Sequence, residues 1–352
     1  MSSVPATLPV IADRVERRLR VLVDAERQRW ASVDSGLEAP IDALSTLLFS
    51  RAKRLRPAFC HWGFVGAGGD PDDPCIVDTG AAFELLHAFA LMHDDVMDGS
   101  ATRRGVRTAH LVFSDHHSEG RWLGESRRFG EGVAILIGDL AFVYADQLMT
   151  GAPDAALELW HELRVELNIG QYLDLLGTAR SDRDPSSAAR IARYKSGKYT
   201  VERPLHLGAA LAAPDRVGEL IEPLSRYGLP LGDAFQLRDD LLGAFGDATL
   251  TGKPVGDDLR EGKPTLLLAM ATARASHGDL KLLGRVGAPD LGPDEIRGIQ
   301  GVLEATGAKA ELEARIDELV NEAVKALDRV ALVPAAIAAL TELAGYIARR
   351  DT

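Results

Sequence analysis

The chain has 352 residues, of which 46% are hydrophobic, enough to bury a large core. Its 52 Asp and Glu residues outnumber 40 Lys and Arg residues, and the formal net charge of -12 argues against binding to nucleic-acid phosphates. Two cysteines, Cys60 and Cys75, do not make a disulfide framework, and the N-terminus lacks a signal-peptide pattern, so we expect a cytoplasmic protein. No apolar run approaches the roughly 20 residues of a membrane span, so none is expected.

Apolar residues recur at three- and four-residue spacing, whereas alternating strand-like segments are scarce, which predicts an all-α protein. No internal repeat or shift in composition marks a second domain, so we expect one domain over residues 1–352. In chain order, the predicted helices are 9–33, 52–66, 75–98, 131–149, 154–177, 187–211, 215–245, 263–275, 293–305, 308–329 and 334–349. Turn-forming residues interrupt the pattern at 66–74 and 246–260.

A first acidic cluster, Asp94, Asp95 and Asp98, lies near the end of the 75–98 helix. The four-residue spacing places Asp94 and Asp98 on one face, about 6 Å apart along the axis. Paired carboxylates of this kind suit Mg²⁺, which binds one or two carboxylates together with substrate phosphate oxygens. The nearly apolar stretch 83–92 just before them favours a cavity lining over a solvated helix end.

Basic residues lie near this cluster in the sequence. Arg103 and Arg104 follow it by a short loop, and the guanidinium fork suits bidentate diphosphate binding. Upstream, the run 51–56 contains four bases, including Lys53 and Arg56, although such a run alone is most often a solvated face. His87 lies two turns before the acidic cluster, and without further support it would be interpreted as a core residue.

A second acidic pair, Asp239 and Asp240, lies on another apolar helix. It is followed by Lys253 and Lys263 on glycine-flanked loops, and lysine ammonium groups are good partners for phosphate oxygens. Two acidic helix faces with basic loops beside them predict a metal–diphosphate clamp in a helical bundle.

Taken in order, these motifs resemble those of the trans-prenyltransferases, the isoprenyl diphosphate synthases, over nearly the whole chain. The matching elements are KRxRP at 53–57, the isolated helix histidine His87, DDxxD at 94–98 with its arginine pair, GQxxD at 170–174, Lys195-Ser196 where the family has KT, FQxxDD at 235–240 and GKxxGxD–GKxT at 252–265. The resemblance implies a bundle of antiparallel helices around a central substrate cavity. Outside the motifs, Lys198 and Tyr199 are possible neighbours of the site, and His110, His116 and His117 are expected at the surface.

The resemblance also implies a mechanism in which isopentenyl diphosphate is condensed head-to-tail with allylic diphosphates of the C5, C10 and C15 classes. Three Mg²⁺ ions, replaceable by Mn²⁺, would be held by Asp94, Asp98 and Asp239, with Asp95 and Asp240 in support. The allylic diphosphate would be held by Arg103, Lys195, Gln236 and Lys253, and Ser196 and Lys263 would be further substrate-binding residues. The isopentenyl diphosphate would be held by Lys53, Arg56, His87 and Arg104, with Arg349 or Arg350 of the C-terminal tail. A homodimer is usual in the family.

The second motif departs from the family pattern, because Gly243 stands where many relatives have a further aspartate. Since the first aspartate is the main ligand in the family, Asp239 is expected to retain the activity. A non-catalytic subunit of a heteromeric synthase is the alternative that this departure leaves open.

Product length is expected to depend on Phe89 and Ala90, five and four residues before Asp94. One aromatic residue at the fifth position resembles synthases of C20 geranylgeranyl diphosphate, with C15 farnesyl diphosphate as the alternative or co-product. On a helical wheel Phe89 lies about 140° from Asp94, so helix geometry alone does not place it in the tunnel.

Three rival functions share parts of this pattern. A class I terpene cyclase also uses DDxxD, but it needs no second diphosphate site such as the cluster of Lys53, Arg56 and Arg104. Head-to-head synthases use DxxxD pairs and fit less well. A helical scaffold would explain the periodicity and leave the ordered motifs unexplained.

Overall fold

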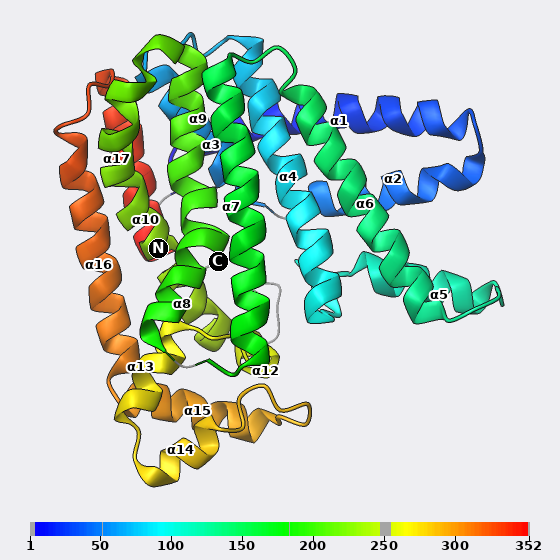
Figure 1. Cartoon of the computed structure of the whole chain (residues 1–352), viewed down its shortest axis with the longest axis vertical. Coiled ribbons are helices and arrows are strands. Elements are labelled where there is room, and N and C mark those ends of the chain that lie inside the picture. The colour runs from blue at the N-terminus through cyan, green and yellow to red at the C-terminus, as the bar shows by residue number, and fades with distance from the viewer. Residues whose placement is uncertain (1–3, 51, 183, 247–254, 351–352) are drawn as a thin grey trace. The chain divides into compact units, whose positions relative to one another are not determined.

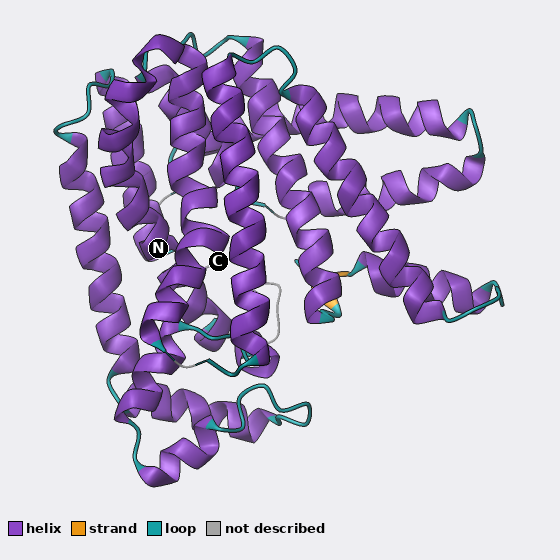
Figure 2. Ribbon diagram, viewed as in Figure 1, coloured by secondary structure: helices purple, strands orange, loops and turns teal. Residues whose placement is uncertain are grey.

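The computed structural model describes residues 4–50, 52–182, 184–246 and 255–350, and these are almost wholly helical (Figures 1 and 2). The prediction of an all-α fold is confirmed. Packing divides the chain into two compact units, with boundaries that include one inside α3 (Leu55–Gly66). We call residues 6–61 and 71–152 the N-terminal unit, and residues 1–5, 62–70 and 153–352 the C-terminal unit. The expectation of one domain over 1–352 stays a prediction.

The N-terminal unit is built around α4 (Pro74–Asp98), which packs against α1 and α6. Pro74 occupies the first turn, where its missing N–H costs little, and the side chain of Asp73 accepts a hydrogen bond from the Cys75 amide. Gly99, at a φ of 66°, ends the helix directly after Asp98. The other elements are α1 (Thr7–Ala31), η1 (Ser35–Leu37), α2 (Glu38–Leu48), β1 (Thr102–Arg103), β2 (Val106–Arg107), α5 (Ala109–Glu119) and α6 (Ser126–Leu148).

The C-terminal unit is organised by α10 (Val217–Phe245), which contacts α9 (Arg203–Ala212), α16 (Ala308–Leu327), α17 (Pro334–Arg349) and η2 (Arg193–Glu202). In Figure 1, α9 lies between α10 and α7 (Asp154–Ala179), which it also contacts. The remaining elements are α8 (Pro185–Ala192), η3 (Pro214–Arg216), α12 (Asp257–Glu261), α13 (Leu266–Arg274), α14 (His277–Leu283) and α15 (Pro293–Ala305).

The sequence predicted one helix over residues 187–211, but the structure has three consecutive elements there, α8, η2 and α9. The middle element, η2, is a π-helix. Two backbone contacts hold it. A Cβ atom on Gly170 of α7 would lie 2.4 Å from the backbone nitrogen of Lys195, and one on Gly232 of α10 would lie 2.5 Å from the carbonyl oxygen of Gly197. Glycine at these positions is what lets both helices approach η2 so closely. Gly170, the first residue of the GQxxD element, is therefore glycine for a structural reason, since a larger residue would collide with η2.

The sequence analysis missed α2, α5, α12 and α14. In α2, Pro40 interrupts the pattern but lies in the first turn, where proline is tolerated. In α5, the buried side is formed by His110, Phe113 and His117, so two histidines occupy positions where a helix pattern has apolar residues. The expectation that His110 and His117 lie at the surface was wrong, whereas His116 is exposed.

Helix α4 is apolar enough over 18 residues, with a mean hydropathy of 1.4, to pass a length and composition test for a membrane span. However, 67% of that window is buried inside the protein, as expected of a core helix. The absence of a membrane span stays a prediction.

Candidate functional site

The first acidic cluster lies at the C-terminal end of α4, where Asp94 and Asp95 are buried. Arg103 contacts both carboxylates: its Nη2 is 3.0 Å from Oδ2 of Asp94, and its Nε donates to Oδ1 of Asp95 over 2.7 Å. Arg103 therefore does not simply neutralise Asp98, because its guanidinium bridges the two preceding aspartates.

Arg103 is positioned by a β-hairpin that follows α4. Strands β1 and β2 pair antiparallel, with Thr102 opposite Arg107 and Arg103 opposite Val106. The two residues of the turn, Arg104 and Gly105, have φ values of 54° and 78°, as a two-residue type I′ turn requires. A left-handed conformation is unfavourable for arginine, so the contacts of the Arg104 side chain must offset that cost.

Those contacts join Arg104 to a cationic cluster in the N-terminal unit. Its Nη2 lies 3.2 Å from Nε2 of His87, and its Nη1 lies 3.4 Å from Oγ of Ser50. Burial, followed by the charges of Arg56 and Arg104, lowers the pKa of His87 well below its ordinary value. His87 is therefore neutral at physiological pH and can accept the hydrogen bond from Arg104. His87 is therefore not an isolated core histidine, and its role in binding a substrate stays a prediction.

Within the basic run 51–56, Arg54 has a structural role. It is 2% exposed and pairs with Glu84 of α4, while its Nη2 donates to Leu48 O over 2.5 Å and lies 3.2 Å from Glu16 Oε1. Lys53 and Arg56, the two predicted substrate ligands of this run, flank Arg54 and are half-buried. The buried ion pair fixes the backbone from which both side chains extend.

The predicted chain-length residue Phe89 packs in an aromatic cluster between α4 and α6. Its ring centroid is 4.7 Å from that of His93 and 4.8 Å from that of Phe142 on α6. Nε2 of His93 lies 3.0 Å from the carbonyl oxygen of Ile135, which holds the imidazole against α6. Ala90, the neighbouring predicted residue, is half-buried. Phe142 was missed by the sequence analysis because no local pattern connects it to Phe89.

In the C-terminal unit, the π-helix η2 carries Lys195 and Ser196. The ammonium group of Lys195 donates to Oδ2 of Asp174 over 2.6 Å, and Asp174 lies on α7 one turn after Gly170. The GQxxD element therefore supplies both the close backbone contact and the carboxylate that holds Lys195. The sequence matched Asp174 to a motif without predicting this pairing.

A buried network supports η2 from the same side. Glu166 of α7 pairs with Lys198, and its two oxygens each accept a hydrogen bond of 2.7 Å from Arg203. These bonds lower the pKa of Glu166 against the opposing effect of burial. Lys198, considered as a possible neighbour of the site, is thus bound within the protein.

The second acidic motif lies on the last turns of α10. Arg350, from the end of the chain, pairs with Asp239, donates to Phe235 O over 3.0 Å and lies 4.0 Å from the centre of the Phe235 ring. Gln236 donates to Oδ1 of Asp240 over 2.8 Å. Burial, together with the charges of Asp258 and Asp239, raises the pKa of Asp240 to about 8. The pairing of Arg350 with Asp239 could not be anticipated, because 111 residues separate them.

The basic loop after α10 is described in part. Lys263 lies 2.6 Å from Glu261 Oε2 and 3.5 Å from Asp258 Oδ1. Lys253, predicted to bind the allylic diphosphate, lies outside the described residues. The roles assigned to the residues of both units stay predictions.

The aspartates of both motifs fit a divalent cation that is completed by a substrate. Across residues 4–50, 52–182, 184–246 and 255–350, no group of three or more His, Cys, Asp or Glu side chains could hold a metal ion unaided. Mg²⁺ usually keeps one or two carboxylates and takes its other ligands from phosphate oxygens and water. Asp94 with Asp98 on one helix face, and Asp239 on another helix, are donor sets of that kind.

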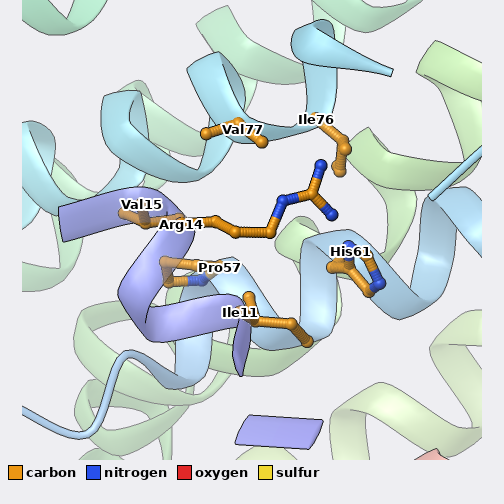
Figure 3. Close-up of a pocket in the computed structure, with 7 residues that line it drawn as sticks. All are labelled: Ile11, Arg14, Val15, Pro57, His61, Ile76 and Val77. Atoms are coloured by element: carbon orange, nitrogen blue, oxygen red, sulfur yellow. The ribbon is translucent and has the colours of Figure 1, made fainter. Parts of the chain in front are cut away.

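A small pocket of the N-terminal unit is lined in part by Pro57, the last residue of the KRxRP element. It lies among α1, α3 and α4, where Arg14 and His61 extend among apolar side chains such as Ile11 and Ile76 (Figure 3). Burial, followed by the charge of Arg14, lowers the pKa of His61 to about 4. None of the predicted site residues lines this pocket, so it gives no support to the site.

The fold and the site define a class of all-helical proteins whose paired aspartates and cationic clusters are suited to binding diphosphates. Comparison with known proteins makes the class specific. The Polyprenyl synthetase family matches residues 38–293. A geranylgeranyl diphosphate synthase of Mycobacterium tuberculosis is 33% identical over 87% of this chain and 82% of that protein. A geranylfarnesyl diphosphate synthase of Aeropyrum pernix is 31% identical over 82% of this chain and 87% of that protein.

A solved structure agrees with these sequence matches. Geranylgeranyl pyrophosphate synthase from Corynebacterium glutamicum, complexed with isoprenyl diphosphate and magnesium, has a TM-score of 0.89, 34% identity and 99% coverage of both chains. The chain belongs to the polyprenyl synthetase family, the trans-prenyl diphosphate synthases. The two curated relatives differ in their named products, so family membership leaves the product length to be argued separately.

Proposed function

We propose that the protein is a Mg²⁺-dependent synthase that condenses isopentenyl diphosphate with C5, C10 and C15 allylic diphosphates to give geranylgeranyl diphosphate. The observation that carries this proposal is the cationic cluster around His87. A terpene cyclase binds one diphosphate, whereas a synthase needs a second cationic site for isopentenyl diphosphate. Arg104 and neutral His87, with Arg56, whose charge acts on His87, would form such a site, and Lys53 lies three residues before Arg56 in the chain.

Several residues would hold the substrates. Arg103 and Lys195 offer charged donors for the oxygens of the allylic diphosphate, and the carboxylates that now bind them would keep them oriented. His87 accepts a hydrogen bond from Arg104 and so fixes the orientation of its guanidinium group. The remaining N–H groups of Arg104 would then be available for the diphosphate of isopentenyl diphosphate. Divalent cations, held by Asp94, Asp98 and Asp239, would neutralise charge developing on the departing diphosphate. Three Mg²⁺ ions, replaceable by Mn²⁺, are proposed, and the C. glutamicum relative was crystallised with magnesium.

The C20 product is supported by the aromatic cluster on α4 and α6. Because Phe89 is held between His93 and Phe142, its ring has a fixed position before the first acidic cluster. A rigid aromatic ring at this position would stop a growing prenyl chain. Farnesyl diphosphate remains the alternative main product or co-product.

The assembly proposed is a cytoplasmic homodimer. On α6, Leu136 and Val143 lie two turns apart on one face and are 63% and 51% exposed. An apolar row of this kind is typical of a helix that is covered by a partner. Light scattering that gave the mass of a single chain would contradict the dimer.

The test is elongation of labelled isopentenyl diphosphate with each allylic diphosphate in the presence of Mg²⁺, followed by chromatography of the dephosphorylated products. We expect a C20 product from all three primers and loss of activity with a chelator, restored by Mg²⁺ or Mn²⁺. A double variant, Lys53→Ala with Arg56→Ala, tests the second diphosphate site. It should raise the KM for isopentenyl diphosphate more than the KM for the allylic substrate. Absence of elongation from every primer would favour the non-catalytic subunit.

A further inference from the structure

The π-helix η2 ends in a wide turn between Lys198 and Arg203. The backbone N–H of Arg203 donates to the carbonyl oxygen of Lys198, five residues earlier, and this is the hydrogen bond that defines a π turn. Pro204 follows directly, and in an α-helix its ring would press on the carbonyl group of Thr200. An ordinary α turn is therefore disfavoured at this point, and the wider turn depends on contacts from outside the helix.

One carboxylate, that of Glu166 on α7, binds both ends of this turn. Its two oxygens accept hydrogen bonds of 2.7 Å from Nε and Nη2 of Arg203, and Oε1 also accepts from the ammonium group of Lys198. In an α-helix, residues five apart point about 140° away from each other. A π turn brings such residues over one another, and this is how Lys198 and Arg203 reach the same carboxylate. We call these three residues the Glu166 cluster.

The Glu166 cluster is buried. Glu166 is 7% exposed, and the side chains of Lys198 and Arg203 are 14% and 13% exposed. Burial by itself would raise the pKa of Glu166, but the hydrogen bonds from Arg203 and Lys198 outweigh it and lower the pKa. The neighbouring carboxylate of Glu202 lies 3.9 Å from Lys198, and burial raises its pKa. Glu166 is therefore the carboxylate that keeps its charge beside the two cations.

The face of α7 that carries Glu166 also holds Lys195. Glu166, Gly170 and Asp174 follow one another at four-residue spacing, so they lie along one face of the helix. Gly170 lets the backbone of Lys195 approach closely, and Asp174 accepts a hydrogen bond of 2.6 Å from its ammonium group. Helix α7 thus fixes η2 at two places, and the π turn determines how far apart along the chain those places are.

We propose that Glu166 is a positioning residue, which holds the π turn between Lys198 and Arg203 and so keeps Lys195 in place for the diphosphate of the allylic substrate. The inference rests on the proposed function, because that function assigns Lys195 to the allylic diphosphate. Lys198 acts on the turn and not on the substrate. A loss of the Glu166 charge should therefore weaken the binding of one substrate more than that of the other.

The test weakens the Glu166 cluster from both sides. Glu166→Gln removes the charge at nearly constant size, Glu166→Asp keeps the charge, and Lys198→Met removes one cation while Arg203 keeps its partner. The double variant Glu166→Gln with Lys198→Met shows whether the two residues act through one contact. Glu158→Gln, which changes an exposed carboxylate two turns earlier on the same helix, is the matched control.

The first readout is the KM for each of the two substrates, and the second is hydrogen–deuterium exchange of residues 193–203, measured by mass spectrometry. We expect Glu166→Gln to raise the KM for the allylic diphosphate about tenfold or more and to leave the KM for isopentenyl diphosphate within about twofold of the wild type. Exchange in residues 193–203 should become about tenfold faster or more, while exchange in α16 stays unchanged.

The other variants complete the expected pattern. Glu166→Asp and Lys198→Met should each have a smaller effect in the same direction. The double variant should be no worse than Glu166→Gln, because the contact is already lost in the single variant. Glu158→Gln should match the wild type in both readouts.

The proposal is overturned if Glu166→Gln speeds exchange in η2 and α16 equally and leaves the KM for the allylic diphosphate unchanged, because that is the signature of a role in stability alone. It is also overturned if the effects of Glu166→Gln and Lys198→Met add. Should Glu166→Gln fail to fold by circular dichroism, Lys198→Met decides the matter through the same two readouts. If the wild type fails to elongate, the proposed function fails, and exchange in residues 193–203 still tests whether Glu166 holds the π turn.

Discussion

The buried ion pair between Arg54 and Glu84 gives a prediction for stability. The two side chains are 1% and 3% exposed, and Glu16 is the second partner of Arg54. Arg54→Met leaves the Glu84 carboxylate buried opposite an apolar side chain. Removing one member of a buried pair costs about 3–5 kcal/mol, and we expect a loss of that size in the free energy of unfolding.

The measurement is urea unfolding followed by far-ultraviolet circular dichroism. Arg54→Met with Glu84→Gln removes the stranded charge and should recover most of the loss. The control Arg226→Met breaks an exposed pair with Glu222 on α10, where the side chains are 57% and 75% exposed, and should cost less than about 0.5 kcal/mol. A loss below about 1 kcal/mol for Arg54→Met, or a double variant less stable than the single one, would refute the reasoning.

Three further predictions follow from contacts described above. Phe89→Ala and Phe142→Ala should each lengthen the product. Their effects should not be additive, because the two rings are in contact. If chromatography shows unchanged product lengths, neither residue determines the chain length. Because the pKa of His61 falls from 6.5 to about 4, the unfolded chain gains a proton that the folded chain does not, so stability should decline as pH falls from about 6.5 to about 4. In urea titrations across that range His61→Asn should flatten the decline, and an unchanged slope would contradict the assignment. Gly170→Ala should slow elongation about tenfold or more, because its Cβ atom would press on the backbone of Lys195, whereas Gly218→Ala should not.

The helices that the sequence predicted best are those with both a regular apolar period and clear end signals. Helix α15 begins at Pro293 and α17 begins at Pro334, and both agree with the predicted ranges at each end. Helix α5 was missed because His110 and His117 occupy its buried side, and hydrophobic period alone cannot identify a buried histidine. The π-helix was missed because its wider turns depend on tertiary contacts with Gly170 and Gly232.

The sequence selects the candidate site residues, whose roles stay predictions, but it does not predict how they pair. The motifs contain Asp94, Arg103 and Lys195, and local order in the chain was enough to select them. The partners of these residues come from other elements, as Asp174 does for Lys195 and Arg350 for Asp239. Such contacts between distant positions follow from packing and leave no periodic signal in one sequence.

The π-helix η2 also affects how this segment tolerates changes in length. Each π turn holds one residue more than an α turn, so an additional residue can be accommodated inside the helix without a loop. Deleting one residue between 193 and 202 would let the segment close into α-helix while Arg203, on the helix that follows, kept its orientation toward Glu166. The close backbone contacts of η2 with Gly170 and Gly232 would be lost instead.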